Sequence, residues 1–291
     1  MTAAMIKTTG FNIQHAVSDD PVILMCPPDF FNVDYVINPW MNAEPVDMDK
    51  ARRQWDALHQ TLTRQLGVSV VLLEPVVGLP DLVFTANAAF VHGQKAVVSH
   101  FKHPERQGET AVFARWFAAH GYDVILSRVD GADVFFEGAG DALTYCNGTD
   151  RQVFAGYKTR TDIRSHELVS QHCGLPVASL ELVSDHFYHI DVCLCPTDTG
   201  HLLYAPSAFD EYGCRVIEQT VPHDRLIPVV QEEARKFACN AISVFDAVVF
   251  NQGSTELVDD MRTKGLYPIE LDLSEFIKSG GSAKCLTLRL V

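Results

Sequence analysis

Basic residues are scarce in this chain of 291 residues, which contains 23 Lys and Arg against 37 Asp and Glu. The formal net charge is −14 at pH 7, and the isoelectric point is about 5.2. Nucleic acids and anionic membranes bind to clustered positive charge, so we expect neither as a partner. A net negative field instead favours the approach of a cationic small molecule.

Long hydrophobic runs are also lacking. No segment approaches the roughly 18 apolar residues of a membrane span, and residues 1–20 hold no apolar run of signal-peptide length. We therefore expect a cytoplasmic protein. The chain is 47% hydrophobic and 21% charged, which is ordinary for a globular protein, and it has no low-complexity segment or linker. We expect a single domain over 1–291.

The cysteines show no pattern of a disulfide framework or a zinc finger. Eight cysteines are spread along the chain without a C-x-x-C pair, and a chain of this length needs no covalent staples. We expect reduced thiols. Cys193 and Cys195 are predicted to belong to the core.

What the chain does contain is a repeated order of strand, hairpin and helix. An apolar strand is predicted at 21–26, and Trp55, Leu58, Leu62 and Leu66 predict a helix over 47–67. Hairpins are predicted to open at 82–91, 137–141, 189–196 and 240–244. Helices are predicted at 104–120, 162–173, 207–219 with Ser207 as its cap, and 254–264.

Polar residues mark the openings of these hairpins at intervals of about 50 residues, which is the signature of a repeat architecture. Six such points bound five units, and they are Asn38, Asn87, Glu137, His189, Asn240 and Cys285. If the first and last half-units combine, the units close a ring. The fold class predicted is α/β, as a five-bladed pseudo-symmetric propeller whose hairpin openings face a common centre.

The segment Gly280-Gly281-Ser282-Ala283-Lys284-Cys285 supplies a candidate nucleophile. Paired glycines allow a tight turn and a close backbone approach, and the residues after Cys285 predict a short strand. Lys284 is expected to help lower the pKa of the adjacent thiol. The alternative is a buried cysteine that acts as a small hydrophobe.

The other residues at the centre form a chemically coherent set around this thiol. His189 is a candidate general acid and base, and the carboxylates Glu137, Asp141 and Asp191 could orient a cation. A planar guanidinium has five donors that match carboxylates bidentately. The sequence therefore predicts attack of a thiolate on a guanidinium carbon.

The motifs GGSAKC, FEGAGD, FTANA and YHID, with the early MCPP and INPWM runs, resemble the guanidine-modifying, or pentein, superfamily over about 21–291. This family includes arginine deiminases, dimethylarginine dimethylaminohydrolases and amidinotransferases. The MCPP, INPWM and FTANA runs look closest to the cyanobacterial-type arginine dihydrolase domain, which converts arginine to ornithine, ammonia and carbon dioxide.

The resemblance implies a five-bladed propeller in which Cys285 is the nucleophile, His189 the acid and base, and Glu137 a partner of the guanidinium. It implies that Asp141 and Asp191 contact the substrate's nitrogens. It also implies that Arg106 and Arg160 bind the carboxylate of the amino acid. Asn38 and Asn87 complete the expected substrate-binding set. The expected substrate is arginine or a methylated arginine, without a metal or cofactor.

Asn87 stands where deiminases of the family generally have aspartate. An aspartate only accepts hydrogen bonds, whereas an asparagine also donates and can bind the neutral ureido group of citrulline. We therefore expect two rounds of hydrolysis at one site. A deiminase or a dimethylarginine dimethylaminohydrolase that stops at citrulline is the alternative, and an amidinotransferase differs only in whether an amine replaces water.

Two readings from other classes stay open. His189, Asp191, Cys193 and Cys195 would share one face of a strand, and zinc uses such ligands, but residues along a strand diverge by about 6–7 Å per pair. A non-enzymatic binding protein is the second, since the same fold also occurs in a ribosome-binding factor. The sequence leaves the oligomeric state open, and a homo-oligomer is one of the states that it allows.

Overall fold

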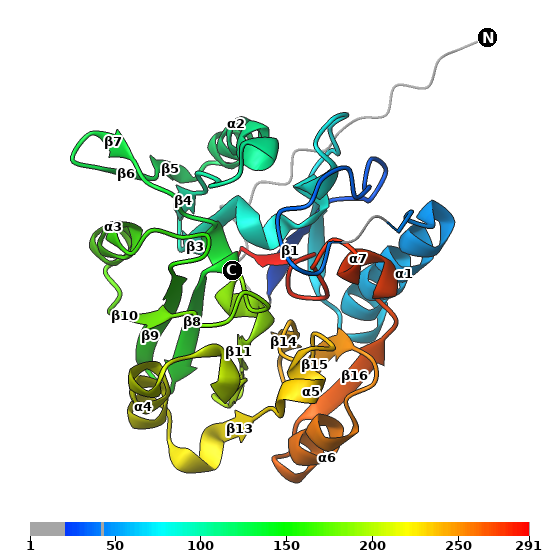
Figure 1. Ribbon diagram of the computed structural model, residues 1–291, viewed down its shortest axis with the longest axis vertical. Coiled ribbons are helices and arrows are strands. Elements are labelled where there is room, and N and C mark those ends of the chain that lie inside the picture. Colours follow the sequence, from blue (N-terminus) through cyan, green and yellow to red (C-terminus); the bar gives the residue numbers. More distant parts are fainter. Residues whose placement is uncertain (1–20, 42–43, 291) are drawn as a thin grey trace.

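The computed structural model describes residues 21–41 and 44–290; segment 1–20, where we expect no signal peptide, lies outside this part. This part of the chain is an α/β protein with five three-stranded sheets and one two-stranded ribbon. The ribbon pairs β6 (Arg128–Val129) with β7 (Ala132–Asp133). In Figure 1 the sheets surround the middle of the molecule, and the longer helices lie outside them.

Each three-stranded sheet repeats one pattern of pairing. Its middle strand is antiparallel to one neighbour and parallel to the other, as in β3 (Ala89–His92), β4 (Lys95–Val98) and β5 (Asp123–Leu126). The same pattern holds in β8 (Ala142–Asn147), β9 (Asp150–Tyr157) and β10 (Val177–Glu181); in β11 (Leu194–Pro196), β12 (Leu202–Tyr204) and β13 (Leu226–Pro228); and in β14 (Ile242–Val244), β15 (Ala247–Asn251) and β16 (Tyr267–Leu271).

The fifth sheet joins the two ends of the described chain. The strand β1 (Val22–Met25) runs antiparallel to β17 (Leu288–Arg289) and parallel to β2 (Ser69–Leu72). In the β1–β17 pair, Ile23 lies opposite Arg289 and Leu24 opposite Leu288. The prediction that the first and last half-units combine is therefore confirmed at the level of strand pairing.

A helix connects the middle strand of each sheet to its parallel neighbour, as a parallel crossover requires. These helices are α1 (Met48–Gln60), α2 (Pro104–Ala119), α3 (Arg164–Cys173), α4 (Glu211–Thr220) and α6 (Thr255–Thr263). The short helices α5 (Gln231–Ala234) and α7 (Ser274–Ile277) lie between units. The predicted helix 47–67 is α1 continued by a π-helical segment, Thr61–Gln65, and it ends before Gly67 at φ +71°.

Two groups of predicted boundaries are wrong. The helix expected at 207–219 begins at Glu211, because the Asp210 side chain accepts the Gly213 N–H at 2.7 Å and caps it in place of Ser207. The strands expected to begin at Leu82 and His189 begin later. They are preceded by 3₁₀ turns at Thr85–Ala88 and Ile190–Val192, so the zinc reading, which needs a strand from His189 to Cys195, loses its premise.

The core is apolar and includes the inner strands of the sheets. Strand β15 is buried along its whole length, and Cys193 and Cys195 are buried in the same cluster as Phe250, which confirms their predicted place in the core. Within residues 21–41 and 44–290, no helix is long and apolar enough to cross a membrane.

Candidate active site

Six of the nine predicted site residues lie in short turns that precede an antiparallel edge strand, whereas Arg106 lies in α2 and Asn38 and Arg160 follow β1 and β9. Asn87 belongs to the turn Thr85–Ala88, Glu137 and Asp141 flank Gly138–Gly140, and His189 and Asp191 lie at Ile190–Val192. Asn240 precedes β14, and Cys285 precedes β17. A repeated turn at the inner end of each unit therefore places one or two polar side chains near the same centre.

Glu137 and His189 form a buried pair. Glu137 Oε2 lies 2.7 Å from His189 Nε2 and 3.0 Å from Arg160 Nη1, and all three side chains are at most 2% exposed. Burial opposes ionisation of Glu137, but Arg160 and His189 hold the pKa of its carboxyl well below the usual range. Burial lowers the pKa of His189 to about 4, although Glu137 opposes this shift.

These shifts set the proton positions at neutral pH. Glu137 is ionised and His189 is neutral, so Nε2 carries the proton and donates a hydrogen bond to the carboxylate. Within the described part of the chain, His189 Nδ1 has no hydrogen-bond partner. Nδ1 is therefore the nitrogen that can accept a proton.

The loop glycine Gly140 lets Asn87 and His189 come close together. A Cβ atom at Gly140 would overlap the Asn87 amide nitrogen and would lie 3.4 Å from His189 Nδ1. The Asn87 Nδ2 donates to the Glu137 carbonyl at 3.1 Å, and its Oδ1 accepts from Arg106 Nη1 at 3.1 Å. Asn87 is thus held with its oxygen toward Arg106.

Asn240 organises the turn that carries Cys285. Its Oδ1 accepts the backbone N–H groups of Ser282 and Cys285, at 3.0 and 3.2 Å. Its Nδ2 donates to the Asp191 carbonyl at 3.0 Å and to the Cys285 sulfur at 3.1 Å. One side chain thus makes four hydrogen bonds in and beside this turn, and it was absent from the predicted site residues.

The thiol of Cys285 is buried, and Lys284 helps to lower its pKa as expected but does not dominate it. Burial and the nearby Asp191 raise its pKa well above the ordinary value, and the opposing effects of Asn240 and Lys284 are smaller. Lys284 alone therefore does not produce a thiolate. A cation placed beside the sulfur would favour ionisation, because an opposite charge stabilises the charged form.

Two further carboxyl groups lie close to these residues. Asp191 Oδ2 accepts from the Cys285 sulfur at 3.4 Å, and Asp141 Oδ1 accepts the Ile190 N–H at 3.0 Å. Burial raises the pKa of Asp191 to about 7 and that of Asp141 well above its usual range. In the described chain, Asp141 Oδ2 and Asp191 Oδ1 are buried without a partner, so each can still accept a hydrogen bond.

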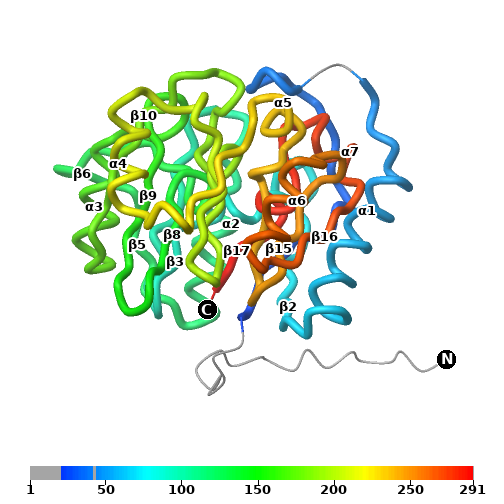
Figure 2. The backbone as a smooth tube through the Cα atoms, turned by 90° about the horizontal axis from the view of Figure 1, so that it is seen from below, coloured from blue at the N-terminus to red at the C-terminus, as the bar shows by residue number. Residues whose placement is uncertain are grey.

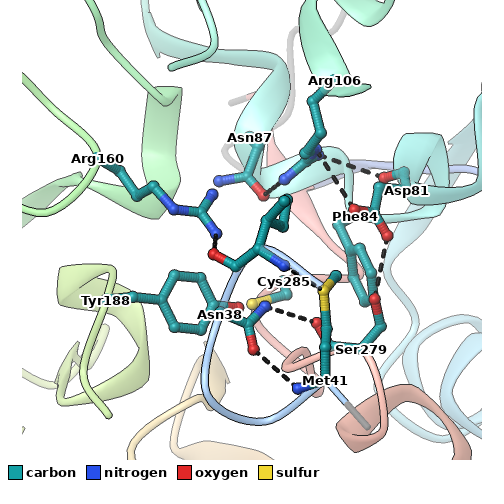
Figure 3. A pocket seen from close by; sticks show the side chains of 11 residues that line it. Asn38, Met41, Asp81, Phe84, Asn87, Arg106, Arg160, Tyr188, Ser279 and Cys285 are labelled. Carbon is teal, nitrogen blue, oxygen red and sulfur yellow. Dashed lines mark hydrogen bonds and ion pairs between the residues drawn. The ribbon is translucent and has the colours of Figure 1, made fainter. Parts of the chain in front are cut away.

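A small cavity, which we call the front cavity, joins part of this set (Figure 3). Its free volume is about 10 Å³, room for about one water molecule. The predicted residues in its lining are Asn38, Asn87, Arg106, Arg160 and Cys285. Four other predicted residues are not in the lining and connect to it through the hydrogen bonds described above. They are Glu137, Asp141, His189 and Asp191.

Both arginines in the lining are buried and engaged. Arg106 binds both carboxylate oxygens of Glu109 at 2.8 Å, and its charge also faces Asp81 at 3.8 Å. Arg160 donates to the Ile37 carbonyl at 2.9 Å, and its guanidinium lies over the Tyr188 ring. A substrate carboxylate would have to share or replace some of these contacts.

The paired glycines of the Cys285 turn approach two side chains closely. Gly280 has φ +86°, and a Cβ there would lie 2.8 Å from the Asn38 amide; one at Gly281 would overlap the Phe84 ring. Asn38 Nδ2 donates to the Ser279 carbonyl at 3.0 Å. This confirms that the glycines permit a close approach.

Sequence reasoning missed several residues of the site. Asn240 lay on the repeat interval, which could have identified it. Tyr188 and Phe84 are the first residues of the YHID and FTANA motifs, and both line the front cavity. Asp81 had no local signal: it accepts from Tyr35 at 2.9 Å and Ser279 at 3.1 Å, and these residues are distant in the chain. Among residues 21–41 and 44–290, no group of three or more His, Cys, Asp or Glu side chains is arranged to hold a metal ion.

The family model for N,N dimethylarginine dimethylhydrolase, eukaryotic, matches residues 32–291. The bifunctional arginine dihydrolase/ornithine cyclodeaminase ArgZ of Synechocystis sp. is 45% identical over 276 residues, which are 94% of this chain and 38% of ArgZ. The chain thus spans less than half the length of that relative. The N(G),N(G)-dimethylarginine dimethylaminohydrolase of Mycobacterium tuberculosis is 42% identical, over 91% of this chain and 84% of that protein.

A solved structure supports the same family relationship. The crystal structure of a mutant N-terminal domain of ArgZ bound to substrate superposes with a TM-score of 0.88 at 44% identity, covering 94% of this chain and 98% of that one. A dimethylarginine dimethylaminohydrolase adduct, 21% identical with a TM-score of 0.73, shows the shared fold. The expected family is confirmed, and the chain belongs to the dimethylarginine dimethylaminohydrolase family.

Proposed function

We propose that this chain hydrolyses the guanidinium group of arginine twice at one site, giving ornithine, two molecules of ammonia and carbon dioxide. The observation that carries the proposal is that Asn87, an amide and not a carboxylate, lines the front cavity together with Cys285. The 45% identity to ArgZ, named as an arginine dihydrolase, supports it.

The first round begins when the guanidinium enters beside Cys285. Its positive charge offsets the burial that keeps the thiol protonated, and Asp141 Oδ2 and Asp191 Oδ1 are the acceptors for its N–H groups. His189 Nδ1 accepts the thiol proton as the sulfur attacks the guanidinium carbon, and the imidazolium then gives that proton to the departing ammonia. A thiouronium then links the substrate to Cys285.

Water completes this round. His189 Nδ1 accepts a proton from the water that attacks the thiouronium carbon, and the thiolate leaves. Glu137 holds the opposite edge of the imidazole and stabilises the imidazolium that forms in each step. The product, citrulline, carries a neutral ureido group.

The second round uses the same groups on the ureido carbon. The sulfur displaces ammonia to form a thiocarbamate, and water releases a carbamate that breaks down to ornithine and carbon dioxide. The Asn87 amide can donate to the oxygen of a neutral ureido group as well as accept from its N–H groups, whereas an aspartate could only accept. Arg106 and Arg160 are assigned to the carboxylate of the amino acid, and Asn38, in the lining of the front cavity, to substrate binding.

The second candidate is hydrolysis of dimethylarginine to citrulline and dimethylamine. The family model and the 42% identity to the Mycobacterium tuberculosis enzyme favour it. An amidinotransferase would need an amine to intercept the thiouronium, and product analysis with added glycine separates it from the hydrolases.

The proposal extends to the fold, the location and the assembly of the protein. The five repeated sheets and the β1–β17 pairing support a five-bladed pseudo-symmetric propeller formed by one domain over 1–291. The expected cytoplasmic location, small cationic substrate and homo-oligomer remain predictions.

Assays of the purified protein with arginine, citrulline and dimethylarginine test the function. We expect ornithine from arginine and from citrulline. Citrulline without ornithine at long times would exclude two rounds and leave a deiminase. Cys285→Ser is the control for the covalent step, and full activity of that variant would overturn the mechanism.

A further inference from the structure

A second, larger cavity lies on the other side of the Cys285 turn. We call it the rear cavity, and its volume is about 850 Å³, within the range of small-molecule sites. Residues from the segments 90–94, 139–146, 194–198, 241–245 and 284–290, together with Arg151, form its lining. Figure 2 shows the loop 30–41, in dark blue, at one end of the molecule, and β17, in red, running toward the opposite end.

Apolar side chains make up much of the lining of the rear cavity. Phe90, Leu143, Leu194, Ile242 and Leu290 come from five different segments and face one space. Such a lining accommodates the apolar body of a ligand, while a few polar groups determine its head group.

The charged groups in this lining are mostly cationic, in a chain whose net charge is −14. They are Arg151, Lys284 and Arg289, against the single carboxylate Asp198. Asp198 is engaged by the Arg289 guanidinium and by the Phe245 N–H at 2.9 Å. Arg151 and Lys284 therefore leave an excess of positive charge that suits an anion.

Lys284 connects this cavity to the nucleophile. Its ammonium can donate three hydrogen bonds, and within the described residues it has one acceptor, the Ala139 carbonyl, at the long distance of 3.4 Å. Burial lowers the pKa of Lys284, which the nearby Asp191 opposes. Lys284 lines the rear cavity while the next residue, Cys285, lines the front cavity.

We propose that the rear cavity binds an organic anion with an apolar body, and that this binding slows the reactions of the Cys285 thiol. The head group lies at Lys284 and Arg151, and the body packs against the apolar strands. The positive charge of Lys284 favours the thiolate of Cys285. A bound anion offsets that charge, so the thiol stays protonated and is less nucleophilic.

Binding can be tested with 1-anilinonaphthalene-8-sulfonate, an aromatic anion whose fluorescence rises in an apolar site. We expect saturable binding of one dye per folded chain, and much weaker binding of N-phenyl-1-naphthylamine, which lacks the sulfonate. Arg151→Glu should weaken dye binding about fivefold or more. The matched change Arg53→Glu, at an exposed position of α1 outside the lining, should leave it unchanged.

A variant that fills the cavity gives a second test. Thr144 lies in the lining, and Thr144→Trp should remove dye binding while the near-ultraviolet circular dichroism stays that of a folded protein. Dye binding of equal strength in wild type, Arg151→Glu and Thr144→Trp would overturn the site, and so would the absence of binding to the wild type.

The link to Cys285 is measured by alkylation with the uncharged reagent iodoacetamide at pH 7, followed by mass spectrometry of the Cys285 peptide. Saturating dye should slow this alkylation by about fivefold in the wild type and much less in Arg151→Glu at the same dye concentration. An unchanged rate at saturation would overturn the coupling. Neither readout needs turnover of arginine, so the result is independent of the proposed function.

Discussion

The side-chain amide of Asn240 donates to the sulfur of Cys285 across 3.1 Å, while its oxygen accepts the backbone N–H of the same residue. One side chain thus positions the Cys285 sulfur and stabilises its charged form, because a hydrogen bond to a thiolate favours that form. The two residues are 45 positions apart in sequence and meet through the repeated turns of neighbouring units.

Replacement of Asn240 should therefore impair the nucleophile more than the fold. We expect Asn240→Ala to lower kcat by about 10²-fold, comparable to the loss of one preorganised donor in other active sites. The pH at which iodoacetamide alkylation of Cys285 reaches half its maximum should move upward. The matched change Asn251→Ala removes a buried amide that bonds Leu273 and Lys236, and it should lower stability without moving this pH. Equal profiles in both variants and the wild type would argue against a role for Asn240 at the sulfur.

Gly140 should tolerate no side chain. A Cβ there would overlap the Asn87 amide, so Gly140→Ala should displace Asn87 and lower arginine hydrolysis by about 10²-fold or more. Gly108→Ala, in helix α2, is the control. A Cβ at Gly108 would meet only the end of the Leu79 side chain, at 3.1 Å. Wild-type activity in Gly140→Ala would show that Asn87 is not required in its observed position.

Buried His166 should make stability depend on pH. Its Nδ1 lies 2.7 Å from Ser179 Oγ and its Nε2 lies 3.2 Å from the Gly156 carbonyl, and burial lowers its pKa to about 4. The unfolded chain takes up a proton below about pH 6.5, whereas the folded chain does not until about pH 4. The contribution of His166 is therefore present above pH 6.5 and is lost as the pH falls toward 4.

The measurement is urea unfolding of wild type and His166→Gln between pH 4 and 7.5. The stability advantage of the wild type should shrink by up to about 3 kcal/mol over the lower part of that range. A difference between the two proteins that is constant with pH would contradict a neutral buried His166.

The sequence could predict the family, the repeated units and most of the candidate site, because these depend on local motifs and on a regular interval. Cys285, His189 and Glu137 lie on that interval. In the structure Glu137 bonds His189, and Cys285 bonds Asp191 in the turn that follows His189. The true starts of the two strands that were expected to begin at Leu82 and His189 could not be predicted. The 3₁₀ turns there contain β-branched residues that also suit a strand, and bonds between distant segments, such as Thr85 to the Leu24 carbonyl at 2.9 Å, hold one of them.

Electrostatics was the other property that local sequence could not predict. Lys284 adjoins Cys285, but burial and Asp191 outweigh its effect on the thiol pKa. Asp81 likewise joins Tyr35, Arg106 and Ser279, which the fold alone brings together.

Asn87 should decide whether one hydrolysis occurs or two. In Asn87→Asp the donor to the Glu137 carbonyl becomes an acceptor, which repels that oxygen and removes a donor for the ureido group. We expect formation of ornithine from citrulline to fall by about 10²-fold or more, with a smaller loss in the arginine step, so that citrulline accumulates. An unchanged ratio of ornithine to citrulline would show that Asn87 does not decide between one hydrolysis and two.

The most direct test of two rounds at one site is the stoichiometry of complete arginine consumption by the wild-type protein, with ornithine, citrulline and ammonia measured together. The account predicts one ornithine and two ammonia per arginine, with citrulline only as a transient. One citrulline and one ammonia per arginine, stable on long incubation, would contradict it.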